Sequence, residues 1–434
     1  MWGHPQLYRA AMPSTIPDVP GTLVTDEIQL GFLRDHVRDL CQISSVRFPG
    51  SQPISFNKKS VSYLLKEDYW VCEKSDGQRV LVLIVVPPMT GQQEVYLIDR
   101  KNMYYRIHNI VFPHYAPETL QAKISNNLLT DTLLDGELVI DHVGPDQTKL
   151  RLLLFDCIIC DGENITRRDL GRRYARLRSQ IYPSYKNYLK EHPDNAMMAP
   201  FEVLVKPMDL AYGIEAVLKK MEYLQHGNDG LIFTSFHAPY VYGTNNAILK
   251  WKPPHENTID FKIELRFPPD LDADSSGETP DYTAKPMFQL FQHVNGMEHE
   301  PFDWLNMSDE EWERWKESGE QLDDRIVECA WHAPSPAGDD IPTWHIKRIR
   351  DDKTTGNHKS TVSRILQSMK DGVVVDELLA QAPAIRTAWK SKERENRRAH
   401  PQRFQRPPLP FKAKGLGPPK PPVARGGPPF VKRR

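Results

Sequence analysis

Short, largely apolar runs dominate the chain between residues 69 and 159. Turn-forming segments such as SDG and PPMTGQQ separate these runs, a pattern that predicts one strand after another. Short connections favour antiparallel pairing of successive strands. The predicted strands read DYWVCEK, RVLVLIVV, EVYLIDR, TLLDGELVI and RLLLFDCII.

Apolar residues at helical spacing flank these strands. A helix is predicted at residues 25–40, and two more are predicted at residues 172–189 and 214–224. The strand-like segments GLIFTS and AILKWK follow the last of them. Strands and helices in this order indicate an α+β arrangement rather than an all-helical or all-strand one.

The pattern changes after Pro253 and Pro254. Four strand-like segments follow, with one helix among them that Ser308 and Glu311 open as a capping box. Short strands with a single helix suit a small barrel such as an OB-fold. These segments are TIDFKIELRF, PMFQLFQHV, RIVECAWHA and TWHIKRIR.

The composition is that of a globular protein: 39% of the 434 residues are hydrophobic and 26% are charged. The longest apolar stretch, near residues 80–89, is far shorter than the roughly 20 residues of a membrane helix. The N-terminus lacks the layout of a secretory signal. We therefore expect an intracellular protein with no membrane partner.

Charge is distributed unevenly along the chain. The net charge is −1, but residues 401–434 hold nine Lys and Arg and no acid, so residues 1–400 carry −10. The same segment contains ten prolines, which predicts a disordered basic tail after a helical pattern at residues 361–398. Its PPLP and PPKPP pieces could also bind a polyproline-reading domain. Because residues 1–400 are acidic overall, any basic groups in them that bind a polyanion such as RNA must be clustered in one place.

Two groups of residues allow more than one interpretation. Cys157 and Cys160 have the CxxC spacing of a metal or redox pair, but they lie in a buried strand without further ligands, which favours packing. Trp304, Trp312 and Trp315 could stack on bases. Their acidic surroundings, SDEEWERW, favour packing in a core or groove instead.

The segment EKSDGQR is the first candidate for chemistry. It places Lys74 at the end of a predicted strand and an Asp-Gly turn after it, whose amides can face an anion. A lysine attacks phosphorus only in its neutral form, so neighbouring cations or a metal ion must favour loss of its proton. A KxDG string alone is weak support. The chain contains neither a P-loop nor a GxGxxG, so a nucleotide must be held in another way.

Further charged residues supply what such a lysine needs. Lys250 and Lys252 in AILKWKPP lie two apart on a predicted strand, so they share a face and suit one phosphate. A solvated strand face is the alternative, which the apolar neighbours Leu249 and Trp251 weaken.

Two acids stand next to glycine turns. Glu137 in TLLDGELVI and Asp229 in HGNDGLIF are each flanked by apolar strand residues. A half-buried acid needs a partner, and a divalent cation would be one. Each acid is equally well interpreted as a turn former or as a ligand.

A third basic group lies in RIRDDKTTGNH. Arg348 and Arg350 share one strand face, and Lys353 follows, a set that suits a polyphosphate. Salt bridges to Asp351 and Asp352 can coexist with that role.

Taken in order, EKSDGQR, LDGELV, LLLFDC, NDGLIF, LKWKPPHENTIDF and RIRDDKTTGNH resemble the covalent nucleotidyltransferases, which comprise capping enzymes and polynucleotide ligases. RxRxDK with the nearby Asn357, and the N-terminal LCQISSVRFPGSQPISF, resemble the fungal type of capping guanylyltransferase. The resemblance covers residues 18–370. It implies an antiparallel-sheet nucleotidyltransferase domain at 1–253 and an OB-fold domain at 254–360, then a helical segment at 361–398 and the tail at 399–434.

The resemblance implies a role for each candidate residue. Lys74 resembles the lysine that carries GMP, Phe155 the ring stacked on guanine, and Lys206 a lysine that reads guanine O6. Asp229 and Asp260 resemble acids that act with the metal ion, although many relatives have Glu in place of Asp229. The implied GTP contacts are Arg79 and Glu137 to the ribose, Lys250 and Lys252 to the α-phosphate, and Arg348, Arg350 and Lys353 to the β- and γ-phosphates.

The implied reaction is messenger RNA guanylyl transfer from GTP with Mg²⁺ or Mn²⁺. Lys74 attacks the α-phosphorus and releases pyrophosphate, and a 5′-diphosphate RNA end then takes the GMP. The barrel must close for the first step and open for the second. The chain has no HCxxGxxR phosphatase loop. The implied partners are therefore a separate RNA triphosphatase subunit and the phosphorylated C-terminal domain of RNA polymerase II, in the nucleus.

Two other functions remain open at this stage. A polynucleotide ligase would use ATP and the same lysine. A non-catalytic scaffold would keep the fold without the chemistry, which the intact lysine, arginines and acids disfavour. Labelling with GTP or ATP distinguishes all three.

Overall fold

The computed structural model describes residues 16–270, 279–332 and 343–399. Residues 1–389 form one unit, and residues 390–434 form a second. The described part of the second unit is the helix α12 (Lys392–Ala399). The basic tail predicted after it lies outside the described residues.

A mixed sheet of eight strands, called the first sheet, contains most of the strands predicted early in the chain. Alternate residues of its central strand β4 enter two different cores: Val80 and Val82 enter one, and Leu81 and Leu83 enter the other. Burial on both faces explains why this strand is apolar throughout. In pairing order the strands are β1 (Thr22–Leu23), β6 (Tyr104–Ile107), β5 (Glu94–Ile98), β4 (Gln78–Val85), β7 (Thr132–Gly144), β8 (Gln147–Cys160) and β10 (Glu202–Val205), with β9 (Glu163–Asn164) beside β8.

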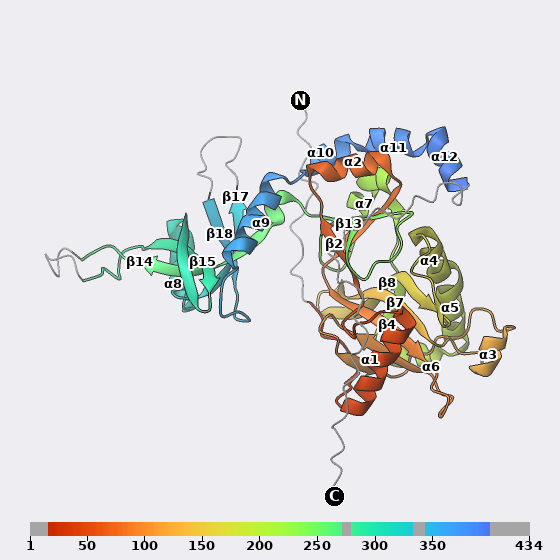
Figure 1. The fold of residues 1–434 in the computed structure, drawn as a ribbon. Helices are drawn as coiled ribbons and strands as arrows, with labels where there is room; N and C mark the ends of the chain where they lie inside the picture. The colour runs from red at the N-terminus through yellow and green to blue at the C-terminus, as the bar shows by residue number, and fades with distance from the viewer. Residues whose placement is uncertain (1–15, 271–278, 333–342, 400–434) are drawn as a thin grey trace, which may run out of the picture. The chain divides into compact units, whose positions relative to one another are not determined.

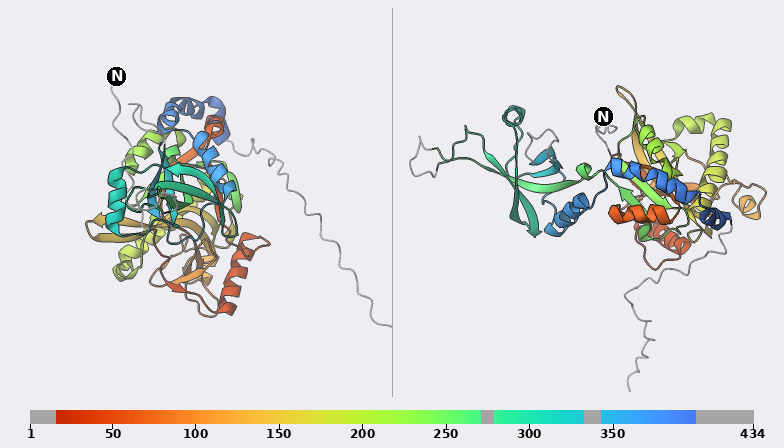
Figure 2. Two further views of the ribbon diagram at one scale, coloured as in Figure 1. Left: turned by 90° about the vertical axis from the view of Figure 1, so that its left-hand side faces the viewer. Right: turned by 90° about the horizontal axis from the view of Figure 1, so that it is seen from above.

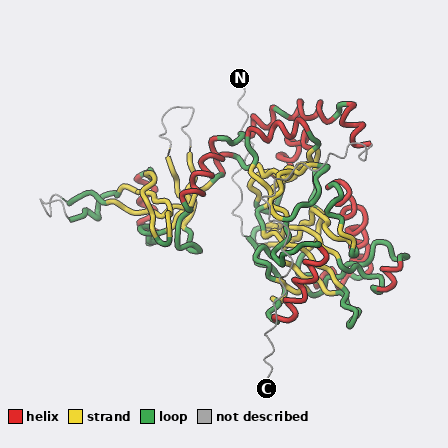
Figure 3. Tube along the Cα trace, in the orientation of Figure 1, coloured by secondary structure: helices red, strands yellow, loops and turns green. Residues whose placement is uncertain are grey.

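Helices cover both faces of the first sheet. The helix α1 buries Leu30 and Leu33 in one core, and the π-helical turn after α4 buries Leu177 and Ile181 in the other. In Figure 3 the strands lie inside and the helices outside. The helices in this part are α1 (Glu27–Cys41), α3 (Leu120–Ile124), α4 (Leu170–Arg176), η1 (Leu177–Ile181), α5 (Tyr182–Glu191) and α6 (Pro193–Met198).

Five further strands form the second sheet, and its core contains Trp251 and Phe233. The same core takes in Val373 and Ile385 from the C-terminal helical segment, and the Trp251 indole donates a 2.8 Å hydrogen bond to the Val373 carbonyl. Helix α11 accordingly lies beside α2 (Figures 1 and 2). The elements are β11 (Asp209–Leu210), β3 (Tyr69–Ser75), β12 (Asn228–Ser235), β13 (Gly243–Trp251), β2 (Ser51–Ser55), α2 (Lys58–Lys66), η2 (Ala211–Gly213), α7 (Ile214–Met221), α10 (Val375–Ala380) and α11 (Ala382–Trp389).

Two features of strand pairing differ from the prediction. β3 and β4 do not pair with each other despite their short connection: β3 pairs with β12, and β4 with β5 and β7. The sheets are also not purely antiparallel, because β8–β10 and β13–β2 are parallel pairs. The turn after Lys74 thus carries the chain from one sheet to the other.

Five strands close into a barrel. The core of the barrel contains Trp312 and Trp344, and Trp315 packs against it, whereas Trp304 is 46% exposed. Core packing therefore accounts for two of the three tryptophans considered from the sequence. The strands are β14 (Thr258–Arg266), β15 (Met287–Asn295), β16 (Glu298–Leu305), β18 (Thr343–Ile349) and β17 (Ile326–His332); the helices are η3 (Pro254–Glu256), α8 (Asp309–Ser318) and α9 (Lys359–Lys370).

All five cysteines are buried and free. Cys157 and Cys160 enter the same core, although residues three apart on a regular strand face opposite sides. A β-bulge causes this, since Leu133 pairs with Ile159 and Leu134 with Cys157. Among the described helices, none has the length and apolar character needed to cross a bilayer.

Candidate active site

Asp229 holds two of the predicted lysines. Its Oδ1 lies 2.5 Å from Nζ of Lys74, and its Oδ2 lies 3.0 Å from Nζ of Lys252. Strand order explains the arrangement, because β12 lies between β3, which ends just after Lys74, and β13, which ends just before Lys252. The three side chains are between one fifth and one third exposed, so a ligand can reach them.

Two glycines let the backbone come close enough to form this arrangement. A Cβ on Gly77 would lie 2.2 Å from the Leu138 carbonyl oxygen, and one on Gly230 would lie 2.0 Å from that of Trp251. Gly230 also has φ +147°, a conformation that side chains disfavour. Both glycines are therefore required next to Lys74 and Asp229. The glycine turns expected beside Asp229 and Glu137 are wrong, because Gly230 lies within β12 and Gly136 within β7.

Lys250 joins the same cluster of cations. Burial lowers its pKa most, and the charges of Lys74, Lys252 and Arg100 lower it further. Its strand neighbours Leu249 and Trp251 are fully buried. Lys250 itself is exposed, so its strand face is open both to solvent and to a ligand.

Glu137 on β7 is half-buried and lies within electrostatic reach of Lys74 and Lys206. Burial raises its pKa most, while the cations of Lys206, Lys74, Arg79 and Arg100 act to lower it. A carboxylate among four cations suits a polar substrate group such as a ribose hydroxyl, which can both donate and accept.

Arg79 is held by the protein itself. Its Nε and Nη2 donate to the two oxygens of Asp135, at 3.0 and 2.6 Å, and its Nη1 donates to the Ser51 carbonyl. Its guanidinium carbon also lies 5.7 Å from the centroid of the half-buried Phe155 ring. In this structure Arg79 supports the wall of the site near Phe155, and its ribose contact stays a prediction.

Lys206 is buried, at 3% exposure. It donates to Ser75 Oγ at 2.7 Å and lies 3.3 Å from Glu73 Oε1. Burial lowers its pKa most, but the charge and hydrogen bond of Glu73, together with Cys72 and Glu137, raise the pKa above its ordinary value. Lys206 is therefore protonated, next to the residue that follows Lys74.

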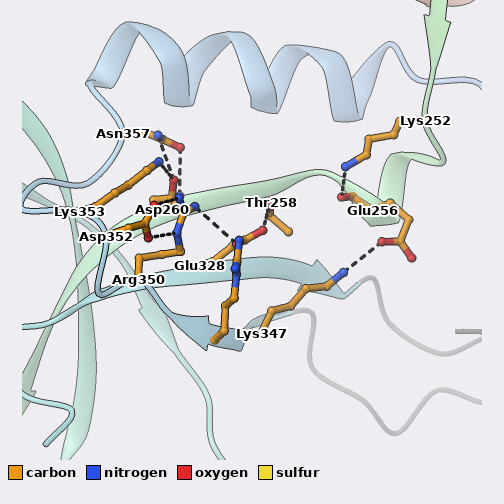
Figure 4. Close-up of polar contacts among 11 residues, drawn as sticks. Lys252, Glu256, Thr258, Asp260, Glu328, Lys347, Arg350, Asp352, Lys353 and Asn357 are labelled. Atoms are coloured by element: carbon orange, nitrogen blue, oxygen red, sulfur yellow. Dashed lines mark hydrogen bonds and ion pairs between the residues drawn. The ribbon is translucent and has the colours of Figure 1, made fainter. Parts of the chain in front are cut away.

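The basic group of RIRDDK gathers around Asp260 on the barrel (Figure 4). Asp260 binds Arg350 at 3.0 Å through one oxygen and Lys353 through the other, and Asn357 donates to it at 3.3 Å. Both of its carboxylate oxygens are thus engaged in this structure. Its predicted role with a metal is not supported by these contacts and stays a prediction.

Arg348 and Arg350 share one face, as predicted, because both lie within reach of Glu328, at 2.8 and 3.6 Å. Of the two predicted acid partners, Asp352 binds Arg350 at 2.8 Å, whereas Asp351 binds Arg325 instead. The side chain of Arg348 is 65% exposed and the side chain of Arg350 only 15%. Arg348 is therefore available to a ligand, while Arg350 would have to exchange partners.

The connection from β13 to the barrel carries a polar contact of its own (Figure 4). Lys252 Nζ lies 3.4 Å from the Glu256 carbonyl, and the Glu256 carboxylate lies 3.1 Å from Lys347 on β18. Lys252 thus belongs both to the Asp229 cluster and to the segment that leads into the barrel.

The structure brings one set of the predicted residues together around Lys74 and the other on the barrel. The first set is Lys74, Glu137, Lys206, Asp229, Lys250 and Lys252, with Arg79 and Phe155 at its edge; the second is Arg348, Arg350, Lys353 and Asp260. The sequence interpretation missed Arg100, which follows β5 and acts on Glu137 and Lys250. Arg100 could have been found from the sequence, because it stands at the end of the predicted strand EVYLIDR, as Lys74 does in its own strand.

A divalent metal ion fits this site only if the protein and the substrate phosphates bind it together. No group of three or more His, Cys, Asp or Glu able to hold a metal occurs in the described ranges. Asp229 offers one carboxylate that faces the lysines. Mg²⁺ is often held by one or two carboxylates together with substrate phosphates and water, and such a donor set fits here.

Replacing Asp229 with asparagine should lower the rate of any reaction at Lys74 by on the order of 100-fold, because it removes the one charge that positions both lysines. The rate is measured by single-turnover covalent labelling. Asp209→Asn is the matched control, since Asp209 pairs with Lys220 on the surface. Equal rates for both variants would show that Asp229 does not position the lysines.

A lysine at a strand end, held by an acid and surrounded by cations for a polyphosphate, defines a nucleotidyltransferase. Residues 15–254 match the family described as mRNA capping enzyme, catalytic domain, and residues 256–379 match mRNA capping enzyme, C-terminal domain. The chain therefore belongs to the mRNA capping enzyme family.

Named relatives agree with this assignment. The mRNA-capping enzyme subunit alpha of Neurospora crassa is 38% identical over 87% of this chain and 95% of its own length. The proteins of the same name from Schizosaccharomyces pombe and Saccharomyces cerevisiae are 38% and 35% identical and cover 87% of this chain, and 90% and 88% of their own lengths. The ATP-dependent DNA ligase of bacteriophage T7 aligns over 70% of this chain and 98% of its own, at 14% identity and a TM-score of 0.31, a score that supports no conclusion.

Proposed function

We propose that this chain transfers GMP from GTP to the 5′-diphosphate end of nascent messenger RNA through a Lys74–GMP intermediate. The observation that carries the proposal is the cluster in which Asp229 holds Lys74 and Lys252 next to Lys250. The cluster has a nucleophile, cations for a phosphate and an acid for a metal. A binding scaffold needs no such combination.

In the first step the Lys74 nitrogen attacks the α-phosphorus of GTP. The N–P bond forms, the bond from the α-phosphorus to the bridging oxygen breaks, and pyrophosphate leaves. Lys250 and Lys252 offset the charge that develops on the α-phosphate oxygens. In the second step a β-phosphate oxygen of the RNA attacks the same phosphorus, which forms GpppRNA and returns Lys74.

The barrel completes the proposal as an OB-fold that closes over the triphosphate. Arg348, Arg350 and Lys353 would then bind the β- and γ-phosphates, for which Arg350 and Lys353 must leave Asp260. The divalent ion, Mg²⁺ or Mn²⁺, would be held by Asp229 together with the phosphates and would neutralise their charge. Opening of the barrel would admit RNA.

Partners follow from the chemistry and from the names of the relatives. Because the fungal relatives are called subunit alpha, we propose that a second subunit, an RNA triphosphatase, supplies the 5′-diphosphate end. The phosphorylated C-terminal domain of RNA polymerase II is the proposed second partner, and the nucleus the proposed location. Co-purification of a tagged chain from nuclear extract tests all three.

The proposed activity is tested with α-³²P-labelled nucleotides and a divalent ion. We expect GTP to leave a covalent label on the protein that survives later denaturation. In the native protein this label should move to 5′-diphosphate RNA but not to 5′-monophosphate RNA. Label from ATP alone would indicate a polynucleotide ligase. If neither nucleotide labels the protein, the scaffold interpretation replaces the proposal.

A further inference from the structure

Glu328 on β17 lies next to both arginines of the barrel. Its Oε2 lies 2.8 Å from Nε of Arg348 and 3.6 Å from Nη1 of Arg350. Its Oε1 accepts a 2.7 Å hydrogen bond from the Thr258 hydroxyl (Figure 4). The side chain of Glu328 is only 16% exposed. The steps of guanylyl transfer described above use the arginines but not this acid.

Strand pairing places Glu328 between its partners. β17 lies between β14 and β18 in the barrel, and Glu328 is the register partner of Asp260 on β14 and of Arg348 on β18. Directly opposite residues share a face of the sheet. Glu328 therefore lies on the same face of the barrel as the basic group around Asp260.

The neighbours of Glu328 keep it ionised. Burial acts most strongly on its pKa and would raise it, but the hydrogen bonds of Thr258 and Arg348 and the charges of Arg348 and Arg350 together lower the pKa below its ordinary value. A carboxylate only accepts hydrogen bonds. Because Thr258 donates to Oε1, Oε2 is left for the arginines.

The two arginines are held in different ways. Arg348 donates to Glu328 through Nε, and its side chain has no other hydrogen bond or ion pair to the described residues. Its terminal nitrogens Nη1 and Nη2 thus remain for a ligand, and such a pair can bind two oxygens of one phosphate. Arg350 uses Nε and Nη2 for Asp352 and Nη1 for Asp260. Arg348 is therefore the arginine that can bind a phosphate without exchanging partners.

We propose that Glu328 is a positioning residue for the pyrophosphate end of GTP: by holding Nε of Arg348 it orients the two terminal nitrogens toward the β- and γ-phosphates. This inference rests on the proposed function. An arginine that is fixed before the ligand arrives loses less side-chain entropy on binding. Pyrophosphate takes part in the first step and in its reversal, but not in the transfer of GMP to RNA. Glu328 should therefore act on one half of the reaction only.

The test measures the two half-reactions separately in the full chain. Single-turnover labelling with GTP and re-formation of GTP from Lys74–GMP and pyrophosphate report on the first step and its reversal. Transfer from isolated Lys74–GMP protein to 5′-diphosphate RNA reports on the second step. In Glu328→Ala we expect the apparent affinities for GTP and pyrophosphate to fall about 10-fold, with transfer to RNA within about twofold of wild type. A purely structural loss would lower both half-reactions.

Two conservative variants show which atoms of the acid matter. Glu328→Gln keeps an oxygen for Nε of Arg348, while its amide can donate to the Thr258 hydroxyl, so affinity for pyrophosphate should stay within about threefold of wild type. Thr258→Val removes the donor to Oε1 and should show the loss of Glu328→Ala in weaker form. Glu300→Ala is the matched control, because Glu300 is a hydrogen-bonded acid of the same barrel, 2.9 Å from the amide nitrogen of Gln292. This control should behave like wild type in both half-reactions.

A double-mutant cycle tests the route through Arg348. If Glu328 acts through this arginine, Glu328→Ala should have little further effect on pyrophosphate affinity in an Arg348→Ala background. Additive effects would overturn the inference, and so would equal losses in both half-reactions or an unchanged affinity for pyrophosphate in folded Glu328→Ala. Should that variant not fold, Thr258→Val decides, and the inference fails if Thr258→Val binds pyrophosphate like wild type. Wild-type labelling by GTP shows separately that the proposed function holds.

Discussion

Arginine in place of Lys74 is expected to abolish covalent labelling by GTP, with a loss of at least about 1,000-fold in the single-turnover rate. Arginine keeps the positive charge that binds Asp229, so the local structure should survive. Its guanidinium does not become neutral near physiological pH, so it cannot act as the nucleophile. Lys74→Arg therefore removes the nucleophile and leaves the ion pair.

Lys59→Arg serves as the control, since Lys59 is an exposed residue of α2. It should label like wild type. Pyrophosphate exchange into GTP, which requires the intermediate, should be lost in Lys74→Arg to the same degree. Label retained by Lys74→Arg would mean that another amine carries the GMP, and Lys250, which shares the cluster, is the next candidate. Mass spectrometry of the labelled peptide would then identify it.

Local patterns were sufficient to predict most elements of the fold. Apolar runs between turn signals predicted the strands β4, β7 and β8, and the capping box of Ser308 and Glu311 is present at the start of α8. The strand β16 was missed, because Glu298, Glu300 and Pro301 make it read as a loop. Its exposed residues carry no periodic signal, and only closure of the barrel requires a strand there.

Pairing was less predictable than the elements themselves. The short SDG turn favoured a β3–β4 hairpin, but close approach of Gly77 to β7 directs β4 into the first sheet. The helical pattern at residues 361–398 was likewise a single run in the sequence. The structure divides it into four helices, and α10 and α11 pack on the core of the second sheet, a contact between residues far apart in the chain.

In the candidate site, too, single residues were predictable from the sequence but their partners were not. The spacing of Lys250 and Lys252 was enough to place both on one strand face. Asp229 and Glu137 were recognised as candidates because each stands next to a glycine. Partners could not be predicted, because they come from other strands: Asp135 holds Arg79, and Glu73 and Ser75 hold Lys206. Sequence spacing shows which side chains share a strand face but not which strand lies opposite.

The buried pair of Arg79 and Asp135 leads to the largest expected effect on stability. Asp135 is fully buried, and besides both guanidinium bonds it accepts a 2.6 Å bond from the Tyr240 hydroxyl. Burial lowers the pKa of Arg79 most, but the charge and hydrogen bonds of Asp135, together with Tyr240 and Glu137, raise the pKa above the usual range. Arg79 is therefore charged in the folded protein and depends on this partner.

Asp135→Asn should lower the free energy of unfolding by about 3–5 kcal/mol, because it leaves a buried guanidinium without a counter-charge. The change is read from urea unfolding at constant m value. Glu215→Gln breaks an exposed pair with Lys219 and should change stability by less than about 1 kcal/mol. The double variant Arg79→Met, Asp135→Leu should recover part of the loss, because neither charge remains buried.

The same variants decide the role of Arg79. If Asp135→Asn unfolds more easily and its residual folded protein binds GTP normally, Arg79 is a support of the wall near Phe155, as its contacts indicate. If stability is unchanged and affinity for GTP falls, the guanidinium belongs to the ribose, as the resemblance predicts. The first result is the expected one, because Asp135 and Ser51 already engage Nε and both terminal nitrogens of Arg79.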